Sequence, residues 1–458
     1  MSDRAAALER AHHHAREYLK TVADRPVRAL LTGAQLRAQL GGSLPIAGEV
    51  ATAVVDRLAA ASGGTIATQG PRYFGFVIGG SMPAATAAEW LVAAWDQNAG
   101  VYNLSPMASV TEEIAAGWVR DLAGLPQTWS AGFVTGCQMA SFTALDVARH
   151  HVLAQAGWDV EARGLFGAPP IHVYTSDESH YTIFMALRML GLGADRVTRI
   201  PTDAQGRMRG DLLAAALGES TGPAIICAQA GNVNTGAFDP LPQIADAARA
   251  RGAWLHVDGA FGLWACASPS RRHLVDGITR ADSIATDAHK WLNAPYDCGI
   301  AMTAHRQSHR KAMTLSAAYI LEEAAERDPR EFVPEESRRA RGIAVYAALR
   351  ELGRDGLAAL VDRCCDHATR IAAKLSTHPS VRILNDVVLN QVLVRFEPET
   401  GDADAFTRKV IERVQQDGTC WLGGTQWHGV TAMRISVSNW TTTAEDVDRS
   451  AEAILRAI

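Results

Sequence analysis

The chain of 458 residues lacks the features of a membrane or secreted protein. It has no apolar run approaching the roughly 18 residues that a membrane-spanning helix needs. The segment that follows Met-Ser-Asp-Arg at the N-terminus is charged and helix-like, without the apolar core of a signal peptide. We therefore expect neither a membrane span nor a secretion signal.

The chain also lacks an excess of positive charge. Lysine and arginine number 44 against 49 acidic residues, which gives a net charge of -5, and no lysine-rich tail or long arginine run is present. Surfaces that bind nucleic acid are basic, so we expect no nucleic-acid partner.

Cysteine is present in an odd number without pattern. The seven cysteines are scattered and show no C-x-x-C spacing. This argues against a disulfide framework and against zinc, and it favours free, mostly buried thiols in a reducing compartment, the cytoplasm. The consecutive histidines 12–14 would suit a metal site, but in their helix-like segment a solvated helix face is the favoured interpretation. We expect no metal.

The rest of the sequence is that of a globular protein with a large core, at 48% hydrophobic and 20% charged residues. From about Ala131, short apolar segments such as Ala224–Gln229 and Trp254–Asp258 alternate with helical ones. This alternation predicts an α/β fold, with a mostly parallel sheet and helices on both faces. We predict an N-terminal helical segment at 1–70, a large α/β domain at 71–342 and a smaller α+β domain at 343–458.

Four candidate groups stand at the carboxyl ends of predicted strands, where ligands of parallel sheets collect. The turn 135–141 opens a helix and forms an anion site, or it is an ordinary strand-to-helix turn. His180 is a functional residue or a helix cap. Asp258 ends an apolar strand and needs a cation, unless it caps the next helix. Lys290, between His289 and a tryptophan, either reaches solvent or is a buried amine whose pKa burial lowers, ready to react with an aldehyde.

Taken together, these groups resemble a known family. Asp-Glu-Ser-His180, His-Val-Asp258-Gly-Ala260 and Asp-Ala-His289-Lys290-Trp-Leu are similar to motifs of the group II amino acid decarboxylases, which depend on pyridoxal 5'-phosphate (PLP). This group includes the aromatic amino acid and glutamate decarboxylases, and it has the aspartate-aminotransferase-like fold (fold type I). The likeness is strong from about residue 71 to 350.

The resemblance implies a role for each of these residues. Lys290 would hold PLP as a Schiff base, and Asp258 would face the pyridine nitrogen and favour its protonated form. His180 would stack on one face of the ring, with Ala260 packed on the other. We therefore expect a PLP-dependent carboxy-lyase that converts an L-amino acid into an amine and CO₂.

Other cofactor contacts follow from the same resemblance. The phosphate would rest on the turn Gly136–Gln138 and near His289, with Cys137-Gln138 in place of the commoner Gly-Ser. Asn234 and Thr235 match a loop that lies near the ring substituents in relatives. Asp287 is awkward beside a phosphate, and its role stays open here.

Two further residues bear on the type of reaction. Tyr319, 29 residues after Lys290, matches a loop tyrosine that returns a proton to the α-carbon in aromatic amino acid decarboxylases; otherwise it is a core tyrosine. Arg434 resembles the carboxylate-binding arginine of aminotransferases, or it is a solvent-facing strand residue. Arg434 supports the alternative of an aminotransferase, while a lyase, an oxidative aldehyde synthase and a catalytically silent relative also remain open.

The substrate pocket is less defined. Tyr73, Phe74 and Tyr102 would line a site for an aromatic or other apolar side chain, although Arg72 would suit an acidic substrate. Relatives build the site at a dimer interface, so we expect a homodimer with shared active sites, and Tyr102 would come from the partner subunit.

Overall fold

The computed structural model describes residues 3–314 and 326–458. The chain divides into two compact units. The small unit comprises residues 1–80, 369–384 and 393–458, and the large unit comprises residues 81–368 and 385–392. The three-domain boundaries expected from the sequence stay a prediction.

The large unit is built on a seven-stranded sheet in the order β1-β7-β6-β5-β4-β2-β3. Only β7 runs antiparallel to its neighbours, so the predicted mostly parallel sheet is confirmed. Burial on both faces explains the continuous apolar sequences of these strands. The strands are β1 Ser130–Val134, β2 His172–Ser176, β3 Thr198–Ile200, β4 Ala224–Gln229, β5 Trp254–Asp258, β6 Ser283–Asp287 and β7 Gly299–Thr303.

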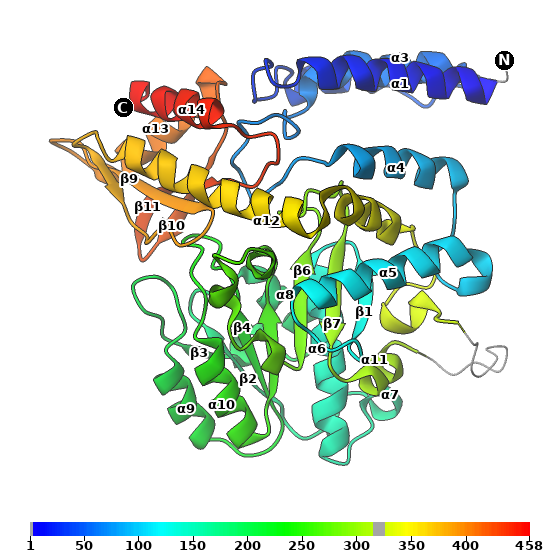
Figure 1. Cartoon of the computed structure of the whole chain (residues 1–458), viewed down its shortest axis with the longest axis vertical. Helices are drawn as coiled ribbons and strands as arrows, with labels where there is room; N and C mark the ends of the chain where they lie inside the picture. The colour runs from blue at the N-terminus through cyan, green and yellow to red at the C-terminus, as the bar shows by residue number, and fades with distance from the viewer. Residues whose placement is uncertain (1–2, 315–325) are drawn as a thin grey trace. The chain divides into compact units, whose positions relative to one another are not determined.

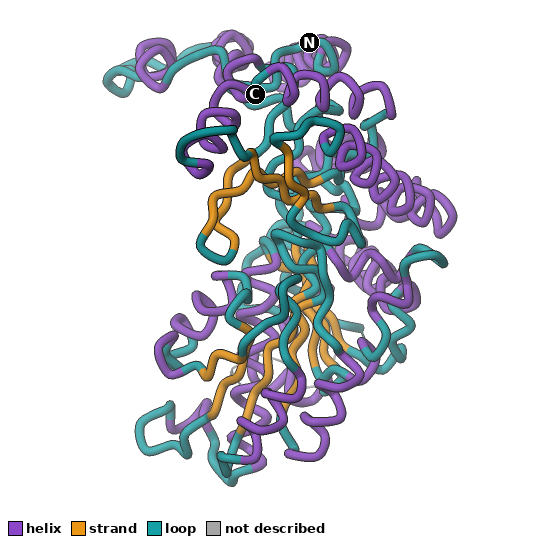
Figure 2. Tube along the Cα trace, turned by 90° about the vertical axis from the view of Figure 1, so that its left-hand side faces the viewer, coloured by secondary structure: helices purple, strands orange, loops and turns teal. Residues whose placement is uncertain are grey.

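Helices lie on both sides of this sheet (Figure 2). One buried cluster joins α6 and α8 to the strands through Leu145, Ile183, Leu187, Ile225 and Trp254. The α-helices are α4 Pro83–Trp95, α5 Pro106–Leu122, α6 Cys137–Gln155, α7 Val160–Arg163, α8 Tyr181–Met189, α9 Gly210–Gly218, α10 Leu241–Arg251 and α11 Arg306–Met313. The short 3-10 turns are η2 Tyr102–Leu104, η3 Ala194–Arg196, η4 Gly262–Ala267, η5 Arg272–Val275, η6 Ile278–Arg280 and η7 Pro329–Phe332.

The small unit combines N-terminal helices with a four-stranded sheet in the order β10-β11-β9-β8, which confirms the predicted α+β character (Figure 1). Helix α12, Arg341–Leu375, runs from the large unit into the small one and is non-helical at Gly353. The other elements are α1 Asp3–Thr21, α2 Gly33–Leu40, α3 Ala51–Ala60, η1 Ala61–Gly64, β8 Val381–Ile383, β9 Gln391–Phe396, α13 Ala403–Asp417, β10 Gly423–Trp427, β11 Val430–Ser436 and α14 Ala444–Arg456.

Two predictions from composition can be compared with the structure. All seven cysteines are free and buried, as expected. Among the described residues, no helix combines the length and the hydropathy that a membrane crossing requires.

Candidate active site

Strand register brings the predicted site residues of the large unit to one edge of the sheet. Gln229 at the end of β4 lies opposite Asp258 at the end of β5, and β6 continues this parallel order to Asp287. Gly299 of β7 pairs with both Val134 and Asp287. The turn after β1 therefore reaches the same edge as the carboxyl ends of β4, β5 and β6.

The turn at Gly136 approaches its neighbours closely. A Cβ atom added to Gly136 would lie 3.1 Å from His289 Cε1, and one added to Gly299 would lie 2.3 Å from the carbonyl carbon of Gly136. Gly299 requires glycine because a side chain would separate the two backbone segments, whereas a side chain at Gly136 would press on the His289 ring. Helix α6 begins at the next residue, Cys137, so its first N–H groups face the site.

Asp258 is the last residue of β5 and is 5% exposed. Its Oδ1 atom accepts the backbone N–H of Ala260 at 3.1 Å and the thiol of Cys137 at 3.5 Å. Burial, followed by the charges of Asp258 and Asp287, raises the pKa of the Cys137 thiol well above its usual range, so the thiol stays protonated and acts as a donor. The carboxylate is thus held by two donors.

Lys290 forms an ion pair with Asp287, the residue whose role the sequence left open. Its Nζ atom lies 3.0 Å from Asp287 Oδ2, and its side chain is 21% exposed. Burial lowers the pKa of Lys290, but the charge of Asp287, supported by that of Asp258, raises it above the ordinary value. The lowered pKa expected from the sequence is therefore wrong, because burial was weighed without the adjacent carboxylate.

His289 is held as a neutral donor. Its Nδ1 atom accepts the backbone N–H of Cys298 at 3.0 Å, which places the ring proton on Nε2, 3.3 Å from Asp287 Oδ1. Burial lowers the pKa of His289 despite the nearby carboxylate. The ring of Tyr296 stacks on His289 at 4.2 Å. Sequence reasoning missed Tyr296, since nothing in the pattern distinguishes it from other loop aromatics.

His180 begins α8 at the carboxyl end of β2. Its Nδ1 atom lies 2.7 Å from Thr182 Oγ1, and its ring centroid lies 4.6 Å from that of Tyr181. The preceding carbonyl of Glu178 accepts hydrogen bonds from the side chains of Gln229 and Asn232, which hold this loop beside β4. Stacking of His180 on a cofactor ring stays a prediction.

Side-chain hydrogen bonds that the sequence did not reveal hold the loop 231–236 in place. Asn232 Oδ1 accepts the backbone N–H groups of Asn234 and Thr235. The Thr235 hydroxyl donates to the carbonyl of Gln205 at 2.7 Å, and Thr235 is fully buried. Contacts of Asn234 and Thr235 with a cofactor stay predictions, as do those of Gln138 and Ala260.

The predicted substrate residues are spread over both units. Tyr102 lies in η2 of the large unit, and its backbone N–H donates to Asp328. Tyr73, Phe74 and Arg434 belong to the small unit, where Tyr73 stacks on Trp421 at 5.1 Å. Their contribution to a substrate pocket stays a prediction. Tyr319 lies outside the described residues.

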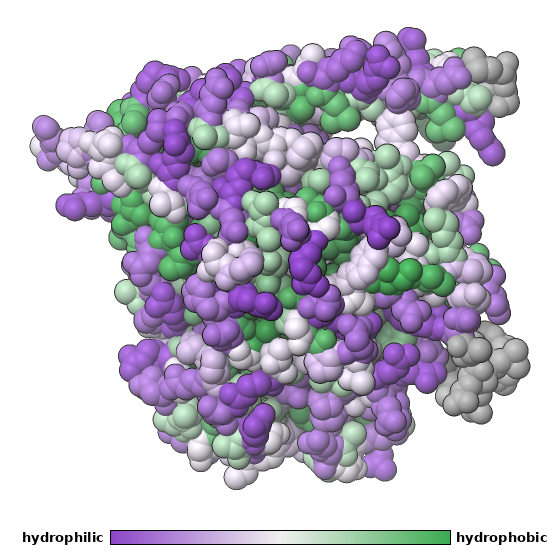
Figure 3. Space-filling model, in the orientation of Figure 1, coloured by the Kyte–Doolittle hydropathy of each residue, from purple (hydrophilic) through white to green (hydrophobic). Residues whose placement is uncertain are grey.

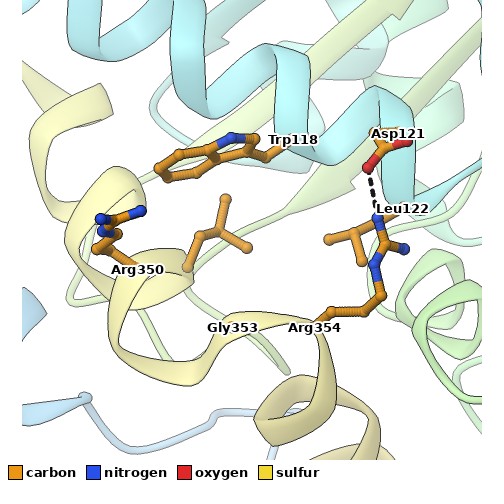
Figure 4. A pocket seen from close by; sticks show the side chains of 7 residues that line it. Trp118, Asp121, Leu122, Arg350, Gly353 and Arg354 are labelled. Carbon is orange, nitrogen blue, oxygen red and sulfur yellow. Dashed lines mark hydrogen bonds and ion pairs between the residues drawn. The ribbon is translucent and has the colours of Figure 1, made fainter.

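A hollow of about 220 Å³ lies elsewhere in the large unit, between α5 and the interruption of α12 (Figure 4). Asp121 and Arg354 form an ion pair at its rim. None of the predicted site residues lines this hollow, so it is separate from the Lys290 site. Its lining comprises Trp118, Asp121, Leu122, Leu349, Arg350, Gly353 and Arg354.

Comparisons with known proteins find relatives that cover most of this chain. L-2,4-diaminobutyrate decarboxylase of Rhizobium meliloti is 31% identical over 81% of this chain and 74% of its own length. Human cysteine sulfinic acid decarboxylase is 28% identical over 90% of this chain and 87% of its own. The crystal structure of Oryza sativa TDC with PLP and tryptamine has the same fold, with a TM-score of 0.92 at 23% identity, covering 100% of this chain and 98% of that one.

A family profile settles the assignment. The profile of the pyridoxal-dependent decarboxylase conserved domain matches residues 34–397, well over half of the chain. This span contains the Gly136 turn, Asp258 and Lys290, which the fold brings to one edge of the large sheet. The chain belongs to the pyridoxal-dependent decarboxylase family.

Proposed function

We propose that Lys290 is the residue through which this PLP-dependent amino acid decarboxylase binds its cofactor covalently, and that Asp258, His289 and the start of α6 hold the rest of it. The observation that carries the proposal is the cluster around Cys137. This residue contacts Asp258 and Asp287, and Asp287 in turn contacts His289 and Lys290.

The donors and acceptors of the site suit the chemical groups of PLP. The cofactor, when bound, supplies an aldehyde, a phosphate and an electron-withdrawing ring. Lys290 is an amine for the aldehyde, and Asp258 is a buried carboxylate for a protonated ring nitrogen. The N–H groups of α6 that follow Cys137 would be donors for a phosphate, and His289 Nε2–H, which lies 3.3 Å from Asp287 Oδ1, would be a further one. Glycine at 136 leaves the space that a Cβ atom would fill.

Each residue of the site would have a separate role in binding or catalysis. Asp258 would lie beside the ring nitrogen, and the Cys137 thiol and Ala260 N–H fix the direction of its carboxylate. His289 offers a proton on Nε2 because Nδ1 is occupied by Cys298. His180 would limit the tilt of the ring. Tyr319 would return the proton to the α-carbon after CO₂ leaves, which favours an amine over an aldehyde or keto acid as product.

Replacing Lys290 tests the proposal. Lys290→Ala should lose the visible absorption of bound PLP and all release of CO₂ and amine, because no other amine would attach the aldehyde. Absorption spectroscopy and a trapped-CO₂ assay measure both. Lys311→Ala, at an exposed lysine of α11, is the matched control and should behave as the parent protein. Unchanged absorption in Lys290→Ala would refute the assignment.

We propose an aromatic or other apolar amino acid as the substrate. Arg72, the residue that would suit an acidic substrate, already has its own partners within the small unit. It pairs with Asp446 at 3.0 Å and donates to the carbonyls of Thr419 and Ala23. Arg434 has no ion-pair partner among the described residues, and its role as a carboxylate clamp remains a proposal. Measuring amine production from each amino acid tests this preference.

We further propose a cytoplasmic homodimer. Seven free, buried thiols suit a reducing compartment. Helix α5 exposes Met107, Val110 and Ile114 at helical spacing, and apolar side chains gather over α4 and α5 (Figure 3). Apolar side chains grouped in this way favour an interface, and a second copy of the chain is the partner that the family suggests. Tyr102, just before α5, would then reach the partner's site.

A further inference from the structure

Asp287 occupies the centre of the candidate site. It is 2% exposed and ends β6. Its backbone N–H donates to the carbonyl of Ala260 at 2.9 Å, and its own carbonyl accepts the indole N–H of Trp264 at 2.9 Å. These two hydrogen bonds fix the position of the Asp287 backbone, from which the carboxylate extends. It is therefore a built part of the site and not a flexible surface acid.

The carboxylate of Asp287 serves three groups at once. Oδ1 accepts the backbone N–H of Cys137 at 2.6 Å and lies 3.3 Å from His289 Nε2, while Oδ2 lies 3.0 Å from Lys290 Nζ. The N–H of Cys137 is the first of α6, where an anion is favoured. The Cys137 N–H that the sequence assigned to a phosphate is thus already engaged by a carboxylate.

The titratable groups that face Lys290 come from several elements. Asp287 ends β6, Asp258 ends β5, and the protonated thiol of Cys137 begins α6. His289 and Tyr296 come from the segment that carries the lysine. Burial lowers the pKa of His289 and raises the pKa of Tyr296 to about 12, so both rings are neutral near pH 7. Asp287 is therefore the carboxylate in direct contact with the ammonium group.

We propose that Asp287 is the counter-ion of Lys290 and sets the pH above which this lysine attaches PLP. The inference rests on the proposed role of Lys290. Attachment forms a C=N bond between Nζ and the aldehyde carbon and releases the aldehyde oxygen as water. It begins from the neutral amine, so the ammonium proton must first leave to solvent. Asp287 opposes that loss, because it stabilises the charged form.

The test follows attachment in the full chain after its PLP has been removed. Saturating PLP is added over a range of pH, and the rate at which visible absorption appears is recorded. Because PLP is saturating, differences in the affinity for its phosphate do not affect this rate. Asp287→Asn keeps an acceptor for the Cys137 N–H but removes the charge. We expect the midpoint of its rate profile to fall by at least about one pH unit, with attachment about tenfold faster below the parent midpoint.

Two further variants separate charge from structure. Asp287→Glu keeps the charge and should stay near the parent midpoint, and Asp287→Ser serves if the asparagine variant does not fold. Borohydride reduction followed by peptide mass spectrometry identifies the labelled lysine. An absence of label on Lys290 in the parent protein would overturn the proposed function. Label on Lys290 with the same midpoint in parent and Asp287→Asn would overturn this inference alone.

Discussion

At the residue scale, the candidate site depends on the close approach of two backbone segments. Gly136 and Gly299 allow the turn before α6 to lie against β7, and the His289 ring fills the remaining space. That ring is fixed by the Cys298 N–H and by the stacked ring of Tyr296. A side chain at Gly136 would therefore meet an atom that has little freedom to move.

Gly136→Ala should weaken cofactor binding more than it weakens the fold. Its φ of 173° is extended backbone that alanine adopts, so the cost comes from the contact of 3.1 Å with His289 Cε1. We expect overpacking of about 1–2 kcal/mol, a loss of roughly 5- to 30-fold in PLP affinity. Absorption titration with PLP measures it.

Gly218→Ala is the matched control, because a Cβ atom there meets nothing within 4 Å. Its PLP affinity should equal that of the parent protein. If Gly136→Ala also binds PLP normally, the His289 ring moves aside freely, and the turn is not the close-fitting donor site described above.

The sequence singled out side chains that the fold brings to one end of the sheet, but it did not predict how they pair. Lys290 and Asp258 stood out because polar residues follow apolar strands. The direction of the Asp287 carboxylate depends on strand register and on two backbone hydrogen bonds, one that Asp287 donates to the Ala260 carbonyl and one that it accepts from the Trp264 indole, none of which the sequence encodes locally. This is also why the direction of the Lys290 pKa was predicted wrongly.

At the element scale, α12 contains a sharp interruption. Gly353 has φ 60° and ψ -175° inside Arg341–Leu375. This conformation is essentially restricted to glycine. The sequence alone does not show which glycine interrupts the helix, because Gly356 in the same helix keeps ordinary helical dihedrals. The turn at Gly353 also forms part of the hollow in Figure 4.

Alanine at the two glycines of α12 should have opposite effects on stability. Gly353→Ala should cost about 1–3 kcal/mol through backbone strain alone, since a Cβ atom there meets nothing within 4 Å. Gly356→Ala should gain up to about 1 kcal/mol from helix propensity, with only ordinary contact to Leu352 at 3.7 Å. Urea unfolding followed by circular dichroism measures both effects. Equal unfolding midpoints for the two variants would contradict the backbone strain expected in Gly353→Ala.

Elements with weak local signals were missed by the sequence analysis. Strand β10 begins with Gly423 and Gly424, and glycine weakens strand patterns, so only its pairing with β11 reveals it. Helix α5 has small residues on its buried face and apolar residues on its exposed face, which blurs the amphipathic signal. That unusual exposed face is what makes α5 relevant to assembly.

At the scale of the whole molecule, the proposed dimer predicts that the mass measured in solution is twice that of one chain. The exposed face of α5 carries Met107, Val110 and Ile114, which are 52%, 39% and 37% exposed, and Leu104 just before it is 58% exposed. The opposite face of the helix is buried against the rest of the large unit. A second copy that covers the exposed face would remove this apolar surface from water.

The double variant Met107→Glu, Ile114→Glu should dissociate the dimer without unfolding the chain, because both side chains already lie at the surface and glutamate is a good helix former. Light scattering should report about 49.0 kDa for the variant and twice that for the parent protein. Leu212→Glu on α9 is matched in exposure, at 38%, and should stay dimeric. A double variant that keeps the parent mass would exclude this face as the interface, since two buried glutamates opposite their symmetry mates would repel.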